Sequence, residues 1–159
     1  MKDSVKSSPV WIDGDKEPVT IENIIDSINA YPHATVSVGC DSHYIGGNYL
    51  FAVVIAVHIP RSGGFFYFAR TRRKDKALKD IMYRLMEETK MSINVACQIR
   101  DIIGHERKID VHLDINTDKR FASFPVLQPA SSWVKSMGFT AVAKPDAWAA
   151  SGLADSFAK

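Results

Sequence analysis

ATVSVGCDSHYIGGNYLFAVVIAVHIPRSGGFFYFART, residues 34–71, decides the fold. It holds three apolar, β-branched and aromatic runs, at residues 34–40, 49–58 and 65–71, separated by glycine-containing turns. Such runs are typical of strands, and short turns between them make consecutive strands antiparallel. The middle run is apolar at nearly every position, which is typical of a strand buried on both faces. The stretch therefore predicts a three-stranded antiparallel meander.

The second half of the chain alternates helical and strand patterns. Apolar residues recur every three or four positions from about 75 to 103, which predicts a long helix that ends at Gly104. Later patterns predict a strand at 109–113, a helix at 131–137, a strand at 139–143 and a last helix starting at Pro145. A strand reached through a helical crossover usually lies parallel to its neighbour. The order βββαβαβα therefore predicts an α/β fold with a five-stranded mixed sheet flanked by helices.

The chain divides into two predicted parts. Residues 1–33 are more polar and form an N-terminal extension, in which we expect a short strand around residues 10–12 and a short helix at 21–30 that Thr20 caps. Residues 34–159 contain all the predicted strands of the sheet and form the main domain. The total of 159 residues suits one domain with a short addition.

Composition excludes several classes of protein. With 46% hydrophobic residues and a net charge of +2, the chain can bury a core, and it is not as basic as a dedicated nucleic-acid binder. The two cysteines are too few for a disulfide scaffold, which predicts a reducing, cytoplasmic location. No stretch has the roughly 20 apolar residues of a membrane span, so we expect no membrane partner.

Four acidic residues lie where carboxylates are unexpected. Asp41 and Asp114 end two predicted strands, Glu88 falls on the apolar stripe of the long helix, and Asp146 lies near the C-terminus. If the two strands are parallel neighbours, both Asp side chains lie at their carboxyl ends, where sites form in open α/β sheets. Convergent carboxylates need a neutralising charge. Two Mg²⁺ or Mn²⁺ ions roughly 4 Å apart would provide it and would activate water for phosphodiester hydrolysis.

Each of these carboxylates also has a structural interpretation. Asp is common where a strand passes into a turn, and Asp146 suits a helix N-terminus. Glu88 could instead reach solvent at the margin of the stripe or pair with a cation. If the helix is turned by one residue relative to the predicted stripe, Glu87 takes the place of Glu88. Asp118 or Asp155 could replace another of the proposed ligands.

Four short pieces carry a resemblance to a known family: Val38-Gly-Cys-Asp-Ser42, Glu88-Thr89 with Ser92, His112-Leu-Asp-Ile115, and Lys144-Pro-Asp146 with Ala149-Ala-Ser151. Together with the element order, they make the chain similar to the YkuK-type family of predicted RNase H-like nucleases. The resemblance spans about residues 34–159. It implies an RNase H-like fold in which Asp41 bridges two metal ions, Glu88 and Asp114 each bind one, and Asp146 completes the site.

A basic run precedes the long helix. It suggests a phosphate-binding edge beside the acidic residues, although a solvated loop explains it equally well. The candidate nucleic-acid-binding residues are Arg70, Arg72, Arg73, Lys74 and Lys76, with Lys144 further along the chain. Aromatic residues could stack on bases or sugars, although such residues more often belong to a core, and the candidates are Tyr44, Phe121, Phe124 and Trp148.

Three functions fit these patterns. The first is a metal-dependent nuclease with a two-metal-ion mechanism. The second is a non-catalytic nucleic-acid-binding or adaptor module on the same fold, and the third is a hydrolase of a small phosphorylated substrate. The sequence leaves DNA, RNA and hybrid substrates equally open.

Overall fold

A computed structural model describes the backbone of residues 9–158, and their side chains except those of residues 150 and 151. Seven strands form one mixed sheet: β1 (Trp11–Asp13), β2 (Pro18–Val19), β3 (Thr35–Ile45), β4 (Asn48–Ile59), β5 (Gly63–Arg73), β6 (Ile109–His112) and β7 (Thr140–Val142). The helices are α1 (Ile21–Ala30), α2 (Ile81–Ile103), α3 (Leu127–Ser136) and α4 (Asp155–Phe157). Short 3₁₀ turns, η1 (Lys76–Lys79) and η2 (Phe124–Val126), precede α2 and α3, and a π-helical segment, η3 (Ala149–Ala154), precedes α4.

The strand order in the sheet is β2-β1-β5-β4-β3-β6-β7. The three long strands β3, β4 and β5 form the predicted antiparallel meander, and β6 and β7 continue the sheet in parallel to β3. The prediction of five strands is therefore corrected to seven. The first additional strand, β1, corresponds to the short strand expected around residues 10–12 and joins the sheet. The second, β2, is two residues long, which is too short to leave an alternating pattern in the sequence.

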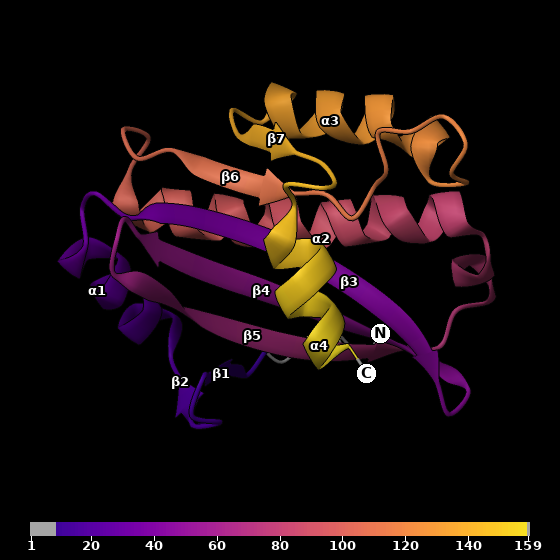
Figure 1. Cartoon of the computed structure of the whole chain (residues 1–159). Coiled ribbons are helices and arrows are strands. Elements are labelled where there is room, and N and C mark those ends of the chain that lie inside the picture. Colours follow the sequence, from indigo (N-terminus) through magenta and orange to yellow (C-terminus); the bar gives the residue numbers. More distant parts are fainter. Residues whose placement is uncertain (1–8, 159) are drawn as a thin grey trace, which may run out of the picture.

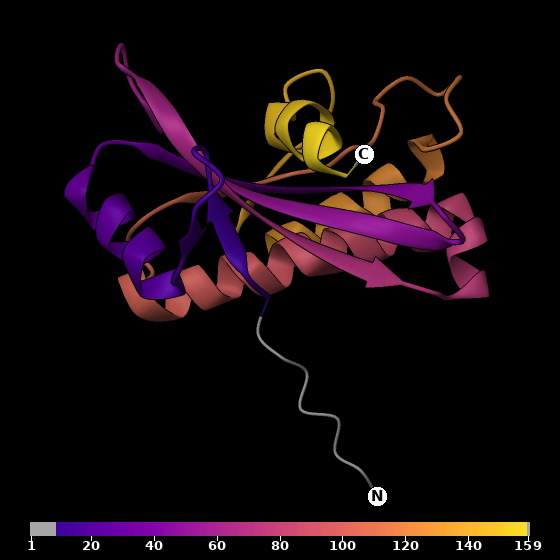
Figure 2. The same ribbon diagram turned by 90° about the horizontal axis from the view of Figure 1, so that it is seen from below.

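Helices cover both faces of the sheet (Figure 1). Seen from below, the sheet separates the C-terminal helical segment from α2 and α3 (Figure 2). The larger core lies on the α2 side, and it includes Ile24, Ile25 and Ile28 of α1, so the N-terminal helix packs into the same core. In residues 9–158, no helix is long and apolar enough to cross a membrane.

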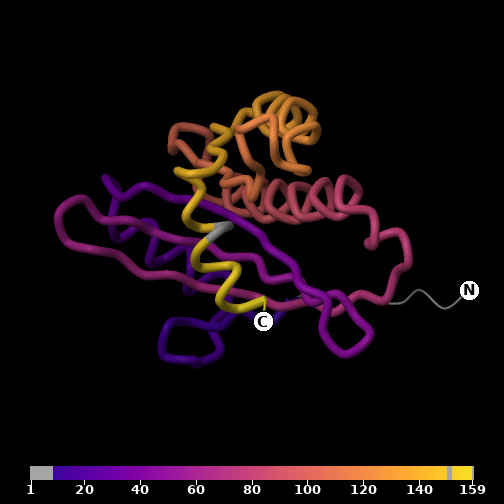
Figure 3. Tube along the Cα trace, turned by 45° about the vertical axis from the view of Figure 1, so that its right-hand side comes forward, coloured from indigo at the N-terminus to yellow at the C-terminus, as the bar shows by residue number. Residues whose placement is uncertain are grey.

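A smaller core lies under the C-terminal segment. Val54, Ala56 and Phe68 of the sheet contact Ala149 and Ala154 of η3, and small side chains let the helical segment lie close to the strands. Figure 3 shows this segment crossing the sheet. The last helical segment begins just before η3 rather than at Pro145 as the sequence predicted, because residues 144–146 form a turn and a bend.

The sheet has an open edge on one side of β3, beyond the point where its pairing with β6 ends. The parallel pairing runs from Val36–Ile109 to Gly39–His112, whereas β3 continues to Ile45. Beyond Gly39, β3 keeps its antiparallel partner β4 on one side and has no β6 residue paired to it on the other. Side chains from both faces of the sheet can therefore meet at this point.

Candidate metal centre

Three of the four predicted carboxylates converge where the sheet opens. Asp41, Glu88 and Asp114 each offer an oxygen, and these atoms all lie within 4.8 Å of one another. Asp41 lies on β3 and Asp114 two residues after β6, so the parallel register carries both carboxylates to the same end of the sheet. Glu88 comes from the middle of α2.

Glu88 is the acidic residue of α2 that reaches the core side. It is 5% exposed, as the apolar periodicity of the helix predicted, and Ser42 Oγ donates a 2.6 Å hydrogen bond to its Oε1. Ser42 also donates from its backbone N–H to Asp41 Oδ1 at 2.8 Å, so one residue orients two carboxylates. Glu87 points elsewhere and accepts a 2.6 Å hydrogen bond from Arg73 Nη1. The alternative helix register is thus excluded.

Burial makes this cluster electrostatically unfavourable when all its members are charged. Desolvation, and after it the charge of Asp114, raise the pKa of Asp41 to about 7. Desolvation followed by the Asp41 charge raises the pKa of Glu88 well above its ordinary value. A nearby cation, Lys144, lies with its Nζ 2.8 Å from Asp114 Oδ1. An all-oxygen donor set with excess negative charge fits a hard divalent cation such as Mg²⁺ or Mn²⁺.

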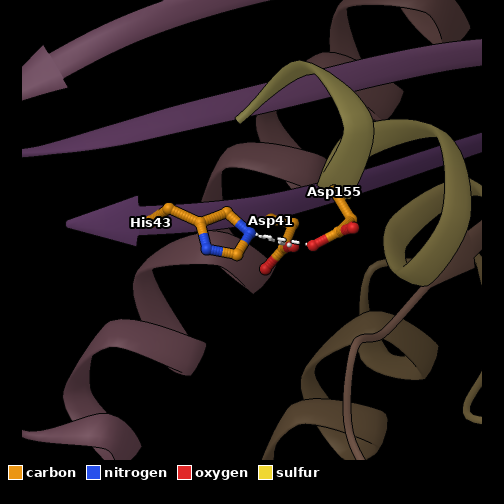
Figure 4. Close-up of side chains that lie close together, drawn as sticks. All are labelled: Asp41, His43 and Asp155. Carbon is orange, nitrogen blue, oxygen red and sulfur yellow. Dashed lines mark hydrogen bonds and ion pairs between the residues drawn. The ribbon is translucent and has the colours of Figure 1, made fainter. Parts of the chain in front are cut away.

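Asp41 also belongs to a second group of possible ligands, and Figure 4 shows its side chain close to those of His43 and Asp155. His43 Nε2 is 3.3 Å from Asp41 Oδ2 and 2.8 Å from Asp155 Oδ1. One possible ligand atom from each of the three side chains lies within 4.8 Å of the other two. His43 is two residues after Asp41 on β3, so both side chains face the side of the sheet that η3 and α4 cover. Asp155, the first residue of α4, meets them there. Asp41 therefore belongs to both groups.

Asp146 lies outside both groups. It is exposed, its backbone N–H donates to Ala143 O, and its own carbonyl accepts from the Trp148 N–H in the turn before η3. Within residues 9–158, the acidic residue that reaches Asp41 from the C-terminal segment is Asp155. Asp118, the other alternative, is held by Arg120 in an ion pair at 2.6 Å.

His112 anchors the segment that carries Asp155. Its side chain is 3% exposed, and its Nδ1 accepts a 3.1 Å hydrogen bond from the backbone N–H of Ala149, the first residue of η3. Its ring also meets the Trp148 ring edge-on at 5.3 Å. Burial lowers the pKa of His112, which favours the neutral ring that this acceptor role requires. No pattern in the sequence indicates this contact, because it joins two segments that only the fold brings together.

The predicted basic residues separate into different surroundings. Arg70 and Arg72 are exposed, and the ladders align Arg70 with Ala52 and Asp41 in one row of the sheet. Directly paired residues face the same side of a sheet, so Arg70 lies on the same face as Asp41. Two strand spacings, about 10 Å, separate the two residues. Arg73 instead pairs with Glu87 on α2. Lys74 follows β5 and Lys76 begins η1, and both are exposed. Lys144 lies beside Asp114.

Metal-free protein should respond to the charge of Asp41. Because its pKa is raised to about 7 in the folded state, against about 4 in an unfolded chain, folding retains a proton that the unfolded chain loses. Stability therefore falls as pH rises through that range. Asp41→Asn removes this charge, so we expect it to raise the free energy of unfolding at pH 8. Each kcal/mol corresponds to a rise in Tm of roughly 2–4 °C. The difference in Tm between the variant and the wild type should shrink towards pH 5.

Thermal unfolding in EDTA between pH 5 and 9 measures this effect. Asp26→Asn, an exposed change on α1, is the control and should have no such pH profile. An Asp41→Asn protein that is less stable than the wild type at pH 8 would contradict the electrostatic description.

Comparison with known proteins identifies a family for the chain. A family model described as Ribonuclease H-like matches residues 19–159. No curated protein and no solved structure matches the chain. The match confirms the resemblance to RNase H-like proteins of the YkuK type that the sequence pieces carried. The chain belongs to the Ribonuclease H-like family.

Proposed function

We propose that this protein is a metal-dependent nuclease that hydrolyses phosphodiester bonds of nucleic acid. The observation that carries the proposal is the convergence of Asp41, Glu88 and Asp114 from three separate elements. Their burial raises the pKa of two of them, which is costly unless a cation compensates. Membership of a family whose name denotes nucleic-acid cleavage supports the same function.

The two ligand groups suit two divalent ions that share Asp41. Glu88 and Asp114 would hold one ion with Asp41, and Asp155 and His43 would hold the other. Bound ions would activate water and stabilise the leaving oxygen. Ser42 keeps the Asp41 and Glu88 carboxylates oriented through its two hydrogen bonds. In this assignment Asp155, rather than the Asp146 expected from the sequence, is the fourth acidic residue.

Basic side chains beside the centre favour a polymeric substrate. Lys144 lies 2.8 Å from Asp114, where it can contact a phosphate oxygen next to the site. Arg70 and Arg72 lie two strands away on the face of Asp41, at a distance that suits a further phosphate of the same strand. Contacts of this kind weaken with salt because bound counterions are released. A small phosphorylated molecule would not reach both positions.

Substitutions at the centre should separate the acidic residues by role. We expect Asp41→Asn and Asp114→Asn to lower Mg²⁺- or Mn²⁺-dependent cleavage by roughly 10³-fold or more, because each removes a charged ligand. Asp155→Asn should also lower it strongly, whereas Asp146→Asn, a matched change on an exposed turn, should stay near wild type.

Labelled single-stranded DNA, duplex DNA, RNA, RNA–DNA hybrid and branched DNA are the test substrates. Cleavage retained in both Asp41→Asn and Asp114→Asn would refute the nuclease. Salt-sensitive binding without cleavage of any substrate by the wild type would support the adaptor module instead.

His43 gives the second ligand group a preference among metals. Imidazole nitrogen binds Mn²⁺ in preference to Mg²⁺, whose ligands are almost all oxygen. We expect His43→Gln to weaken Mn²⁺ binding by roughly tenfold and to change Mg²⁺ binding much less.

Pulsed electron paramagnetic resonance of the Mn²⁺-loaded protein detects a directly bound nitrogen. The wild type and the exposed control His105→Gln should show this nitrogen coupling, and His43→Gln should lose it. Mn²⁺ bound without nitrogen coupling in the wild type would remove His43 from the ligand set and leave Asp41, Glu88 and Asp114 in place.

A further inference from the structure

A hollow of about 270 Å³ opens directly beside the carboxylates. Asp41, Glu88 and Asp114 line one side of it. The rest of the lining includes Lys144 beside Asp114, Ile81 and Arg84 of α2, and Asn116 and Phe121 of the loop that follows Asp114. The hollow is thus the approach to the candidate metal centre from the α2 side.

The polar lining suits a phosphate and a base edge. Arg84 is fixed, because its Nη1 donates to Leu78 O at 3.1 Å and its guanidinium lies over the Tyr49 ring at 5.2 Å. Lys144 lies at the acidic side of the hollow. Asn116 adds a side-chain amide, which carries both donors and an acceptor of the kind that base edges require.

The apolar lining is unusually exposed. Phe121 is 50% exposed and Ile81 is 40% exposed, and both line the hollow. The flat, apolar face of a base is a partner that removes such side chains from water.

The loop that carries Phe121 is held in place before any ligand arrives. The Asn116 N–H donates to Ser123 Oγ at 3.0 Å, and the Phe121 N–H donates to Asp118 O at 3.2 Å. Asp118 in turn accepts hydrogen bonds from the Arg120 guanidinium. A loop tied at both ends loses little further freedom when it binds, so its exposed aromatic ring is a ready contact surface.

We propose that this hollow binds one unpaired nucleotide next to the bond to be cleaved, with its base against Phe121. The volume of about 270 Å³ lies just below the range of pockets for drug-sized ligands, so it suits one base with its sugar better than a base pair. The substrate is therefore a single strand, or a duplex with an unpaired end or loop. This inference rests on the proposed nuclease function and names its substrate class.

Binding of short oligonucleotides tests the proposal without cleavage. Fluorescence anisotropy compares a labelled 12-nucleotide single strand with its blunt duplex, in Ca²⁺ conditions under which both stay intact. Phe121→Ala should weaken single-strand binding roughly tenfold and leave duplex binding unchanged, since stacking on one aromatic ring is lost. Phe121→Trp should restore it. Ile102→Ala, an equally exposed apolar residue near the far end of α2, is the control.

The outcomes separate this inference from the nuclease assignment. Equal losses on single strand and duplex, or no loss with Phe121→Ala, would overturn the nucleotide site even if the wild type cleaves. A selective loss on single strands would support the site, and the parallel Mg²⁺ or Mn²⁺ cleavage assay would then decide the nuclease independently.

Discussion

The site depends on one constraint, the point at which the β3–β6 ladder ends. Because pairing stops at Gly39 and His112 while β3 continues, Asp41 lies at an open place in the sheet where Asp114 reaches it from the next strand. Glu88 arrives from α2 on one face and Asp155 from α4 on the other. A longer β6 would fill this opening with main-chain hydrogen bonds and keep the carboxylates apart. The acidic cluster therefore depends on the short length of β6 as well as on the acidic side chains themselves.

The same opening sets the balance between stability and function. The core on the α2 side brings Glu88 to a buried position, and burial makes its charge and that of Asp41 unfavourable. The fold tolerates this because Ser42 donates to both carboxylates and Lys144 lies beside Asp114. On the opposite face, His112 fixes the first residue of η3, and so fixes where Asp155 emerges. Buried carboxylates whose charge destabilises the fold are common at sites where a ligand supplies the compensating positive charge.

Features that repeat along the sequence, such as the apolar stripe of a helix, could be predicted, whereas features set by a single turn or a very short strand could not. Helical periodicity placed Glu88 rather than Glu87 towards the core. The predicted parallel pairing brings Asp41 and Asp114 together, although the strand of Asp41 continues to Ile45 instead of ending before it. Asp146 follows a proline and resembles a helix start, yet its segment is a turn, and the helix that supplies Asp155 begins later. The short strand expected around residues 10–12 is β1, whereas β2 was missed because two residues carry no alternation. The contact of His112 with Ala149 and the exposure of Phe121 depend on packing between distant segments, which a single sequence does not contain.

The most direct test of the central claim is the position of bound metal. Crystals of the protein grown with Mn²⁺ would show the ions by anomalous scattering at the manganese edge. The account predicts two peaks that share Asp41, one with Glu88 and Asp114 and the other with His43 and Asp155. Ordered carboxylates with no peak at Asp41, or manganese bound only elsewhere on the surface, would contradict it.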